Sequence, residues 1–230
     1  MLIDASKYRK RSVEQKLKKA EIATLQIAFV GCTGAGKSKT INALFKKDVS
    51  VVGDSPEPET MEIKPYYLTE KIIIWDTPGL GDGQANDIKH KKTIKDLLLS
   101  DYCSNGARYR QIDLVVIIIE ASKRDFGTTR QLLEDVIIPT ISADRILVAV
   151  NQADAAMKGH NWNKSRCRPQ PKLSLFLERM SQNIQETIYH DIGVSIPKPI
   201  YYSSEFEYNI NKLMDLIINH IPKQRIYISE

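Results

Sequence analysis

Apolar residues occur in short runs along the chain, and stretches with helical spacing separate these runs. Five runs are continuous and rich in β-branched residues, at residues 25–30, 72–75, 114–119, 146–150 and 199–202. Polar turns bound them, and this pattern is typical of parallel strands buried on both faces of a sheet. A sixth run, residues 63–68, alternates apolar and polar positions and contains Pro65, which predicts a strand at the sheet edge.

Helices are predicted between the strands, at residues 37–46, 87–100, 128–136, 172–189 and 208–221. The last has apolar residues at i, i+3, i+4, i+7 and i+8, namely Ile210, Leu213, Met214, Ile217 and Ile218. Strands that alternate with helices predict a three-layer α/β fold, with a mostly parallel six-stranded sheet and one antiparallel edge strand. In such a fold, ligand-binding loops follow the carboxyl ends of the strands.

Residues 1–22 lie outside this alternation. Ser12 and Gln15 have the spacing of a capping box, and Val13, Leu17 and Ala20 share one helical face. We therefore expect a basic helical extension over residues 1–22, followed by one domain over residues 23–230. The helix either packs on this domain or contacts a partner or an acidic surface.

Composition narrows the class of protein. A chain of 230 residues suits one large α/β domain, and its net charge of +5 is mild and concentrated near the N-terminus, which is weak evidence for nucleic acid. The three cysteines show no paired or metal-binding spacing and suit a reducing cytosol. We expect no signal peptide and no transmembrane segment, because the longest apolar run is far too short, and a cytoplasmic location.

The segment GCTGAGKS, residues 31–38, follows a predicted strand and opens a predicted helix. It has the pattern G-x-x-x-x-G-K-[ST], in which backbone amides and the helix N-terminus surround a phosphate. Lys37 would reach the outer phosphates, and the hydroxyl of Ser38 would ligate Mg²⁺. The segment therefore predicts a site for a nucleoside triphosphate with magnesium.

Two further segments fit the same site. The strand at residues 72–75 leads to Asp76, which can support the metal, and then to Thr77, Pro78 and Gly79, whose amide can approach the terminal phosphate. Residues 51–61, rich in proline and acidic residues, predict an exposed, mobile loop. Thr60, near its end, is the candidate hydroxyl that closes onto magnesium and the third phosphate, with Ser55 as the alternative.

The strand at residues 146–150 leads into the sequence N-x-x-D, residues 151–154, which indicates the base of the bound nucleotide. The carboxylate of Asp154 can accept two hydrogen bonds from guanine N1 and N2, whereas adenine lacks this donor pair, which disfavours an adenine-nucleotide kinase or ATPase. Asn151 would brace the phosphate loop. After the last strand, a backbone amide near Ser204 in the sequence Ser203-Ser204-Glu205 can meet guanine O6.

In this order the motifs resemble the five guanine-nucleotide motifs of the TRAFAC-class GTPases. The chain looks most like the Era-like branch, including bacterial YfjP/YeeP-type GTPases of prophages and mobile elements, and is also similar to septin, GIMAP and immunity-related GTPases. The resemblance covers residues 24–221 and implies bound GTP or GDP with Mg²⁺. It implies catalytic roles for Lys37, Thr60 and Gly79, and metal binding by Ser38, Thr60 and Asp76. The residues that it places at the nucleotide are Thr33, Gly34, Ala35, Gly36, Lys37, Ser38, Lys39, Asn151, Gln152, Asp154, Ser204 and Glu205.

Two residues depart from the pattern of these families. Gln152 replaces the lysine whose stem usually covers the guanine ring, so nucleotide affinity is expected to be lower. Leu80 replaces the glutamine that orients the attacking water in Ras-like members, so GTP hydrolysis is expected to be slow or to use another group. Asp82, Asp87 and His90 follow, and they either position this water or are solvated.

Two functions remain open from the sequence. The first is a switch that binds Mg-GTP, hydrolyses it slowly and then releases the segments around Thr60 and Gly79. The alternative is a GTP-dependent assembly or binding module with negligible turnover, which Leu80 favours. Candidate partners are a second copy bound through the nucleotide face and an effector protein or RNA. The basic residues 155–172 either contact RNA or protein or form a solvated loop.

Overall fold

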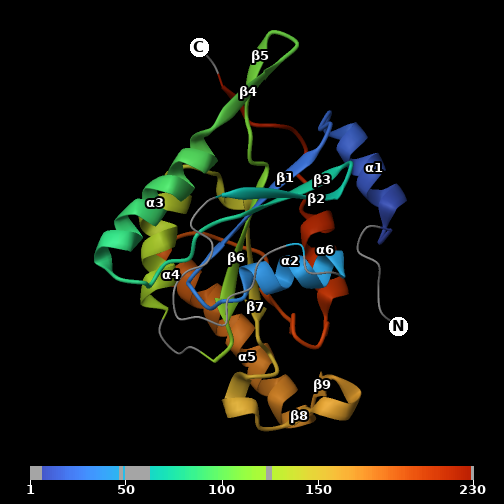
Figure 1. Cartoon of the computed structure of the whole chain (residues 1–230), viewed down its shortest axis with the longest axis vertical. Coiled ribbons are helices and arrows are strands. Elements are labelled where there is room, and N and C mark those ends of the chain that lie inside the picture. The colour runs from blue at the N-terminus through green and yellow to red at the C-terminus, as the bar shows by residue number, and fades with distance from the viewer. Residues whose placement is uncertain (1–6, 47–48, 50–62, 123–125, 229–230) are drawn as a thin grey trace.

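The structure is a computed structural model that describes residues 7–46, 49, 63–122 and 126–228. Its centre is a six-stranded sheet in the order β10-β7-β6-β1-β3-β2 (Figure 1). The strands are β1 (Leu25–Gly31), β2 (Lys64–Thr69), β3 (Ile72–Asp76), β6 (Leu114–Glu120), β7 (Ile146–Asn151) and β10 (Ile200–Tyr201). Only β2 is antiparallel to its neighbour in this sheet, so the predicted sheet with its antiparallel edge strand is confirmed.

Helices cover both faces of the sheet. The longer helices are α1 (Lys10–Lys19), α2 (Lys37–Phe45), α3 (Gln84–Leu99), α4 (Gly127–Leu132), α5 (Pro171–Thr187) and α6 (Ile210–Asn219). One hydrophobic cluster joins the sheet to α1, α2 and α6, and a second joins the other face to α3, α4 and α5. Alternate residues of β1 face opposite clusters, because successive side chains of a strand point to opposite faces. A strand with a core on both sides is continuously apolar, which is why the sequence pattern locates these strands.

The helices differ from the sequence prediction mainly at their ends. Helix α3 begins at Gln84, one turn earlier than predicted. Helices α4 and α5 each continue into a π-helical turn, at Leu133–Ile137 and Ile188–Ile192. Short 3-10 turns occupy Ala143–Arg145, Ala156–Gly159 and Lys164–Arg166.

A small sheet at residues 101–110 was not predicted. Strands β4 (Asp101–Ser104) and β5 (Ala107–Arg110) form a hairpin, and β11 (Tyr227–Ile228) pairs with β5. The turn is Asn105-Gly106, with φ of 51° and 76°, and this dipeptide favours two-residue hairpins because both positions need positive φ. The dipeptide was the available signal, but the two strands have only four residues each and no apolar run.

Helix α1 packs on the domain next to α6. Val13, Leu17 and Ala20 are buried, which confirms the predicted apolar face. The predicted capping box is wrong, because the helix begins at Lys10 and Arg9 precedes it in a left-handed conformation without a side-chain cap. The side chain of Arg9 instead donates to Asp215 of α6, with 2.7 Å between Nη1 and Oδ1.

The basic segment at residues 155–172 is more ordered than the solvated loop considered from the sequence. Strands β8 (Trp162–Asn163) and β9 (Arg168–Pro169) form a small antiparallel ribbon that leads directly into α5. Trp162 is buried against Phe206 and Tyr208, with ring centroids 5.3 Å and 5.5 Å away. An aromatic anchor therefore fixes the ribbon to the loop before α6.

Candidate functional site

The phosphate loop, residues 31–38, connects β1 to α2. Gly36 has a φ of 82°, and a Cβ there would lie 2.3 Å from Nδ2 of Asn151, so this position requires glycine. The Lys37 side chain is buried, and its Nζ donates to the carbonyl oxygens of Gly31 and Cys32, each at 3.2 Å. The loop therefore folds around its own lysine, with that cation held at its centre.

A second brace holds the phosphate loop from α2. The hydroxyl of Thr40 donates to the carbonyl oxygen of Gly36 at 2.7 Å and lies 2.7 Å from the hydroxyl of Tyr202. Because Thr40 has one hydroxyl proton, Tyr202 is the donor in the second bond. Tyr202 is fully buried, and this burial raises the pKa of its hydroxyl above the usual range. Neither Thr40 nor Tyr202 was among the residues predicted from the sequence.

The predicted metal ligands that the structure describes lie side by side. The hydroxyl of Ser38, in the first turn of α2, donates to Oδ2 of Asp76 at the end of β3, at 2.8 Å. Mg²⁺ prefers such oxygen ligands and is usually bound by one or two protein groups together with substrate phosphates. Thr60 and its alternative Ser55 lie outside the described residues.

The DTPG loop, residues 76–83, packs directly on the phosphate loop. A Cβ on Gly79 would lie 2.6 Å from the backbone nitrogen and Cα of Thr33, so only glycine fits. The amide of Thr33 donates to the carbonyl of Leu80 at 2.8 Å, and its hydroxyl donates to Asp82 at 2.5 Å. The side chain of Leu80 is 1% exposed and packs in the core with α3. Leu80 therefore contributes its backbone to the site and its side chain to the core.

Helix α3 holds the DTPG loop from the other side. His90 is 2% exposed, and its Nδ1 lies 2.7 Å from the carbonyl oxygen of Gly79. One carboxylate oxygen of Asp87 accepts a hydrogen bond from the amide of Gly81 at 2.8 Å. The solvated alternative is therefore wrong for His90, whose ring nitrogen faces the backbone of the loop. The sequence showed no sign of this contact, because it depends on where α3 packs.

Asn151 connects the phosphate loop to the turn after β10. It is fully buried, and its Nδ2 donates to the carbonyl of Ala35 at 3.0 Å, while its Oδ1 accepts from the amide of Ser204 at 3.1 Å. At the surface, Nζ of Lys39 lies 3.4 Å from a carboxylate oxygen of Glu205. Segments far apart in the sequence thus meet at one edge of the sheet, the carboxyl edge of its parallel strands.

Asp154 and Gln152 lie in the turn that follows β7. The hydroxyl of Ser203 donates to Oδ1 of Asp154 at 2.5 Å, so a serine to which the sequence assigned no role orients the candidate base-reading carboxylate. Gln152 has a φ of 60°, and its Nε2 donates to the carbonyl of Gly34 at 2.6 Å. Its side chain therefore reaches over the phosphate loop.

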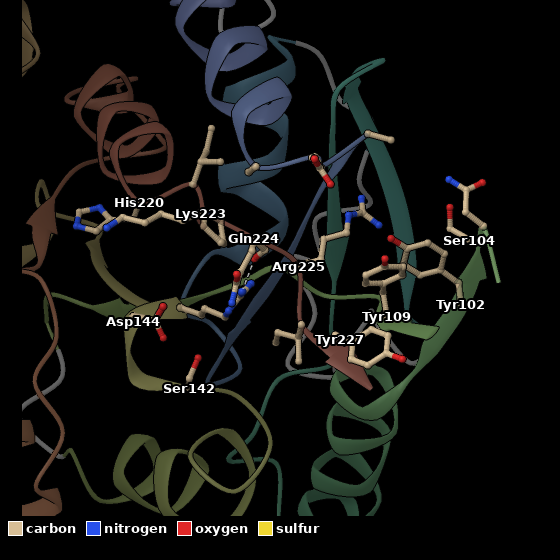
Figure 2. A pocket seen from close by; sticks show the side chains of 18 of the residues that line it. Tyr102, Ser104, Tyr109, Ser142, Asp144, His220, Lys223, Gln224, Arg225 and Tyr227 are labelled. Carbon is tan, nitrogen blue, oxygen red and sulfur yellow. Dashed lines mark hydrogen bonds between the residues drawn. The ribbon is translucent and has the colours of Figure 1, made fainter. Parts of the chain in front are cut away.

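A separate hollow of about 1260 Å³ lies at the amino ends of β1 and β7 (Figure 2). Tyr102, Tyr109 and Tyr227 form one wall, and the guanidinium of Arg225 lies 5.0 Å from the ring centre of Tyr102. The buried Arg145 also lines the hollow. The lining contains none of the nucleotide-site residues predicted from the sequence, so this hollow is distinct from the phosphate loop.

Comparison with known proteins decides the family. The family model described as 50S ribosome-binding GTPase matches residues 26–152, more than half of the chain. The chain belongs to this GTPase family. The matched residues contain the phosphate loop, the DTPG loop and Asn151, and the predicted P-loop GTPase with Era-like similarity is confirmed.

Curated relatives of this GTPase are similar over different lengths. The probable GTP-binding protein EngB of Thermotoga petrophila is 32% identical over 91 residues, which cover 40% of this chain and 45% of that protein. The uncharacterized protein YfjP of Escherichia coli is 23% identical over 206 residues, covering 86% of this chain and 62% of YfjP. GTPase Era of Heliobacterium modesticaldum is 24% identical over 208 residues, which cover 87% of this chain and 56% of that protein. The chain thus spans less than two thirds of each of these relatives.

Solved structures share the fold. Toc33 from Arabidopsis thaliana in complex with GDP and Mg²⁺ has a TM-score of 0.65 and 18% identity, covering 98% of this chain and 95% of Toc33. Era in complex with MgGDPNP and a segment of 16S ribosomal RNA has a TM-score of 0.58 and 14% identity, covering 87% of this chain and 57% of that Era chain. The chloroplast translocon components atToc33 and psToc159, for whose GTPase activity dimerization is important, give a TM-score of 0.60 at 16% identity, covering 100% and 98%. Among the described residues, no helix of this GTPase is long and apolar enough to cross a membrane.

Proposed function

We propose that this chain is a guanine-nucleotide switch that binds Mg-GTP and Mg-GDP and hydrolyses GTP slowly. The observation that carries the proposal is the position of Asn151, which ties the phosphate loop to the turn that would meet the base. A single buried side chain thus connects the candidate triphosphate and base sites. The division into a helical extension, residues 1–22, and a GTP-binding domain, residues 23–230, is part of this proposal, as is a cytoplasmic location.

The roles proposed for individual residues follow from their places in the site. Lys37 would neutralise the outer phosphates, Ser38 and Asp76 would hold Mg²⁺, and the amide of Gly79 would contact the γ-phosphate. Mg²⁺, when bound, neutralises charge on the phosphate oxygens. Asp154 would accept hydrogen bonds from guanine. Loss of the γ-phosphate would release the DTPG loop, and an effector, a protein or an RNA, would distinguish the two states.

Slow hydrolysis is proposed because of Leu80. Its buried side chain has no polar atom with which to orient a water molecule at the γ-phosphate. In related enzymes, positioning of the attacking water is a substantial part of catalysis. We therefore expect phosphate release that exceeds that of a Lys37→Ala variant but remains slow without a partner. Phosphate release equal to that of Lys37→Ala would reject the enzymatic part of the proposal.

The base assignment has a direct test. Labelled GDP bound to the purified protein is competed with GTP, GDP, ATP and ADP in the presence of magnesium. We expect displacement by guanine nucleotides only, and a shift toward xanthine nucleotides in Asp154→Asn, because the amide presents a donor where guanine needs an acceptor. Asp96→Asn makes the same chemical change on an exposed part of α3 and should leave competition unchanged. Equal displacement by ATP would overturn the guanine assignment.

The alternative is a GTP-dependent assembly module with negligible turnover, in which two copies meet through the nucleotide face. Leu80 favours it, and the structural similarity to Toc33-type proteins, for whose GTPase activity dimerization is important, adds support. Size-exclusion chromatography with GDP and with a non-hydrolysable GTP analogue separates the proposals. A dimer formed only with the analogue, without phosphate release, would favour the module. A monomer in both states would favour the switch.

A further inference from the structure

A stretch of the chain near α5 carries an unusual excess of positive charge. Residues 155–177 contain no aspartate or glutamate. The cations in this stretch are all exposed, and none forms an ion pair or a side-chain hydrogen bond with a described residue: Lys158, Lys164, Arg166, Arg168 and Lys172. The next acid along the chain, Glu178, is paired with Lys198. The charge of this stretch is therefore not neutralised within the described part of the protein.

The cations stand on a rigid support. In the β8–β9 ribbon, Oδ1 of Asn163 accepts hydrogen bonds from the hydroxyl of Ser165 at 2.8 Å and from the amide of Arg166 at 3.0 Å. Trp162, one residue earlier, is buried against Phe206 and Tyr208. The backbone that carries the charges is thus fixed before any partner binds, which lowers the entropic cost of binding.

Helix α5 adds apolar side chains to the same end of the molecule, because it begins directly after the ribbon (Figure 1). Lys172, Leu175, Phe176 and Arg179 have i, i+3, i+4 and i+7 spacing and therefore share one face of the helix. Leu175 is 53% exposed and Phe176 is 41% exposed. The opposite face carries the residues of α5 that pack in the core.

We propose that the ribbon and the outward face of α5 form a docking surface for an anionic phospholipid membrane. We call the set Lys164, Arg166, Arg168, Lys172, Leu175, Phe176 and Arg179 the ribbon surface. Its cations match the negative charge of lipid headgroups, and the two apolar side chains enter the boundary between headgroups and acyl chains. A phosphodiester backbone would use the cations but would leave Leu175 and Phe176 in water, so the apolar pair favours a lipid surface over a nucleic acid. The surface lies outside the nucleotide site and does not depend on the function proposed above.

The test is sedimentation of the full chain with vesicles. Vesicles of equal parts phosphatidylcholine and phosphatidylglycerol should bind the protein, and vesicles of phosphatidylcholine alone should not. Because each cation near such a surface changes partitioning about fivefold, the double variant Lys164→Gln/Arg166→Gln should bind about 25-fold more weakly. Lys92→Gln/Lys95→Gln removes the same charge from exposed positions on α3 and should bind like the wild type.

The apolar pair separates a membrane from any other polyanion. Leu175→Ser/Phe176→Ser keeps every charge and should weaken vesicle binding about tenfold. An unchanged melting temperature and an unchanged circular dichroism spectrum would show that these variants are folded. The proposal is overturned by equal sedimentation with both vesicle types, by no sedimentation with either, or by an α3 variant as weak as the ribbon variant. It is also overturned if the serine variant binds vesicles normally while a structured RNA binds the wild type and not the ribbon variant.

Discussion

Asn151 offers the sharpest test of the arrangement, because its side chain bonds two segments that lie far apart in the sequence. Replacing it with alanine removes a donor to the carbonyl of Ala35 and an acceptor from the amide of Ser204. Both backbone groups are bonded by a fully buried side chain, so each loses a partner that water replaces poorly. A buried group left unsatisfied costs about 1–3 kcal/mol, so with two such groups the nucleotide-free protein should lose about 2–6 kcal/mol of unfolding free energy.

The measurement is urea unfolding of nucleotide-free protein, followed by circular dichroism. The expected loss is a large part of the about 5–15 kcal/mol that stabilises a typical domain, so the unfolding midpoint should fall clearly. Asp154→Asn is the matched control. It keeps an oxygen that can accept from Ser203, so it should change nucleotide-free stability by less than about 1 kcal/mol.

The two variants therefore distinguish the stabilising hydrogen bonds of Asn151 from the recognition of guanine by Asp154. Asp154→Asn should lose guanine binding and keep its stability, whereas Asn151→Ala should lose both. Equal nucleotide-free stability of Asn151→Ala and Asp154→Asn would refute the reasoning, because the hydrogen bonds from Asn151 would then contribute nothing before nucleotide binds.

Three further changes test other parts of the structure. Gly79→Ala places a methyl group against the backbone of Thr33, so the DTPG loop must shift. In fluorescence titrations, we expect a GTP analogue to bind about tenfold more weakly than to the wild type, and the affinity for GDP to change by no more than about twofold. Equal losses for both nucleotides would contradict a contact between Gly79 and the γ-phosphate. Gln152→Lys replaces the hydrogen bond to the carbonyl of Gly34 with an aliphatic lysine stem that can cover the guanine base. The affinity for GDP should rise about tenfold. An unchanged affinity would show that this position does not face the guanine ring. Burial raises the pKa of Asp113 from 3.8 to about 7, so the folded state binds this proton more tightly than the unfolded state and stability should fall as pH rises between these values. Urea unfolding at about pH 5 and about pH 8 should show a loss of at most about 3 kcal/mol in the wild type that Asp113→Asn lacks. Equal pH dependence in both proteins would exclude this carboxyl as its source.

The main sheet could be predicted from the sequence because each central strand is buried on both sides. In β7, residues 146–150 form a continuous apolar run that is buried, and only the last buried residue, Asn151 at the site, is polar. The hairpin of β4 and β5 has no such constraint. Its strands are short, partly exposed and charged, so only the Asn105-Gly106 turn marked them. Sequence patterns reveal burial, and they miss strands that are not buried.

The same physical difference divides the candidate site. The residues of the phosphate loop could be predicted because they form one contiguous motif, and the spacing of this motif is specific to phosphate binding. Thr40 and Tyr202 could not, because they are 162 positions apart and Tyr202 supports the phosphate loop through the hydroxyl of Thr40. His90 is similar, since its contact with Gly79 depends on how α3 packs rather than on any local pattern. A single sequence therefore shows which residues can bind phosphate, but it does not identify the residues that hold them in place.

Leu80 shows how the two kinds of information combine. From the sequence, it marks a missing glutamine and therefore a missing group to orient water. In the structure, its backbone pairs with Thr33 of the phosphate loop, while its side chain is buried with α3 in the hydrophobic core. A polar side chain at this position would begin inside that core, where an amide without partners costs free energy. The slow hydrolysis that we propose thus has a basis in how the DTPG loop packs, and faster turnover would need a polar group supplied from elsewhere.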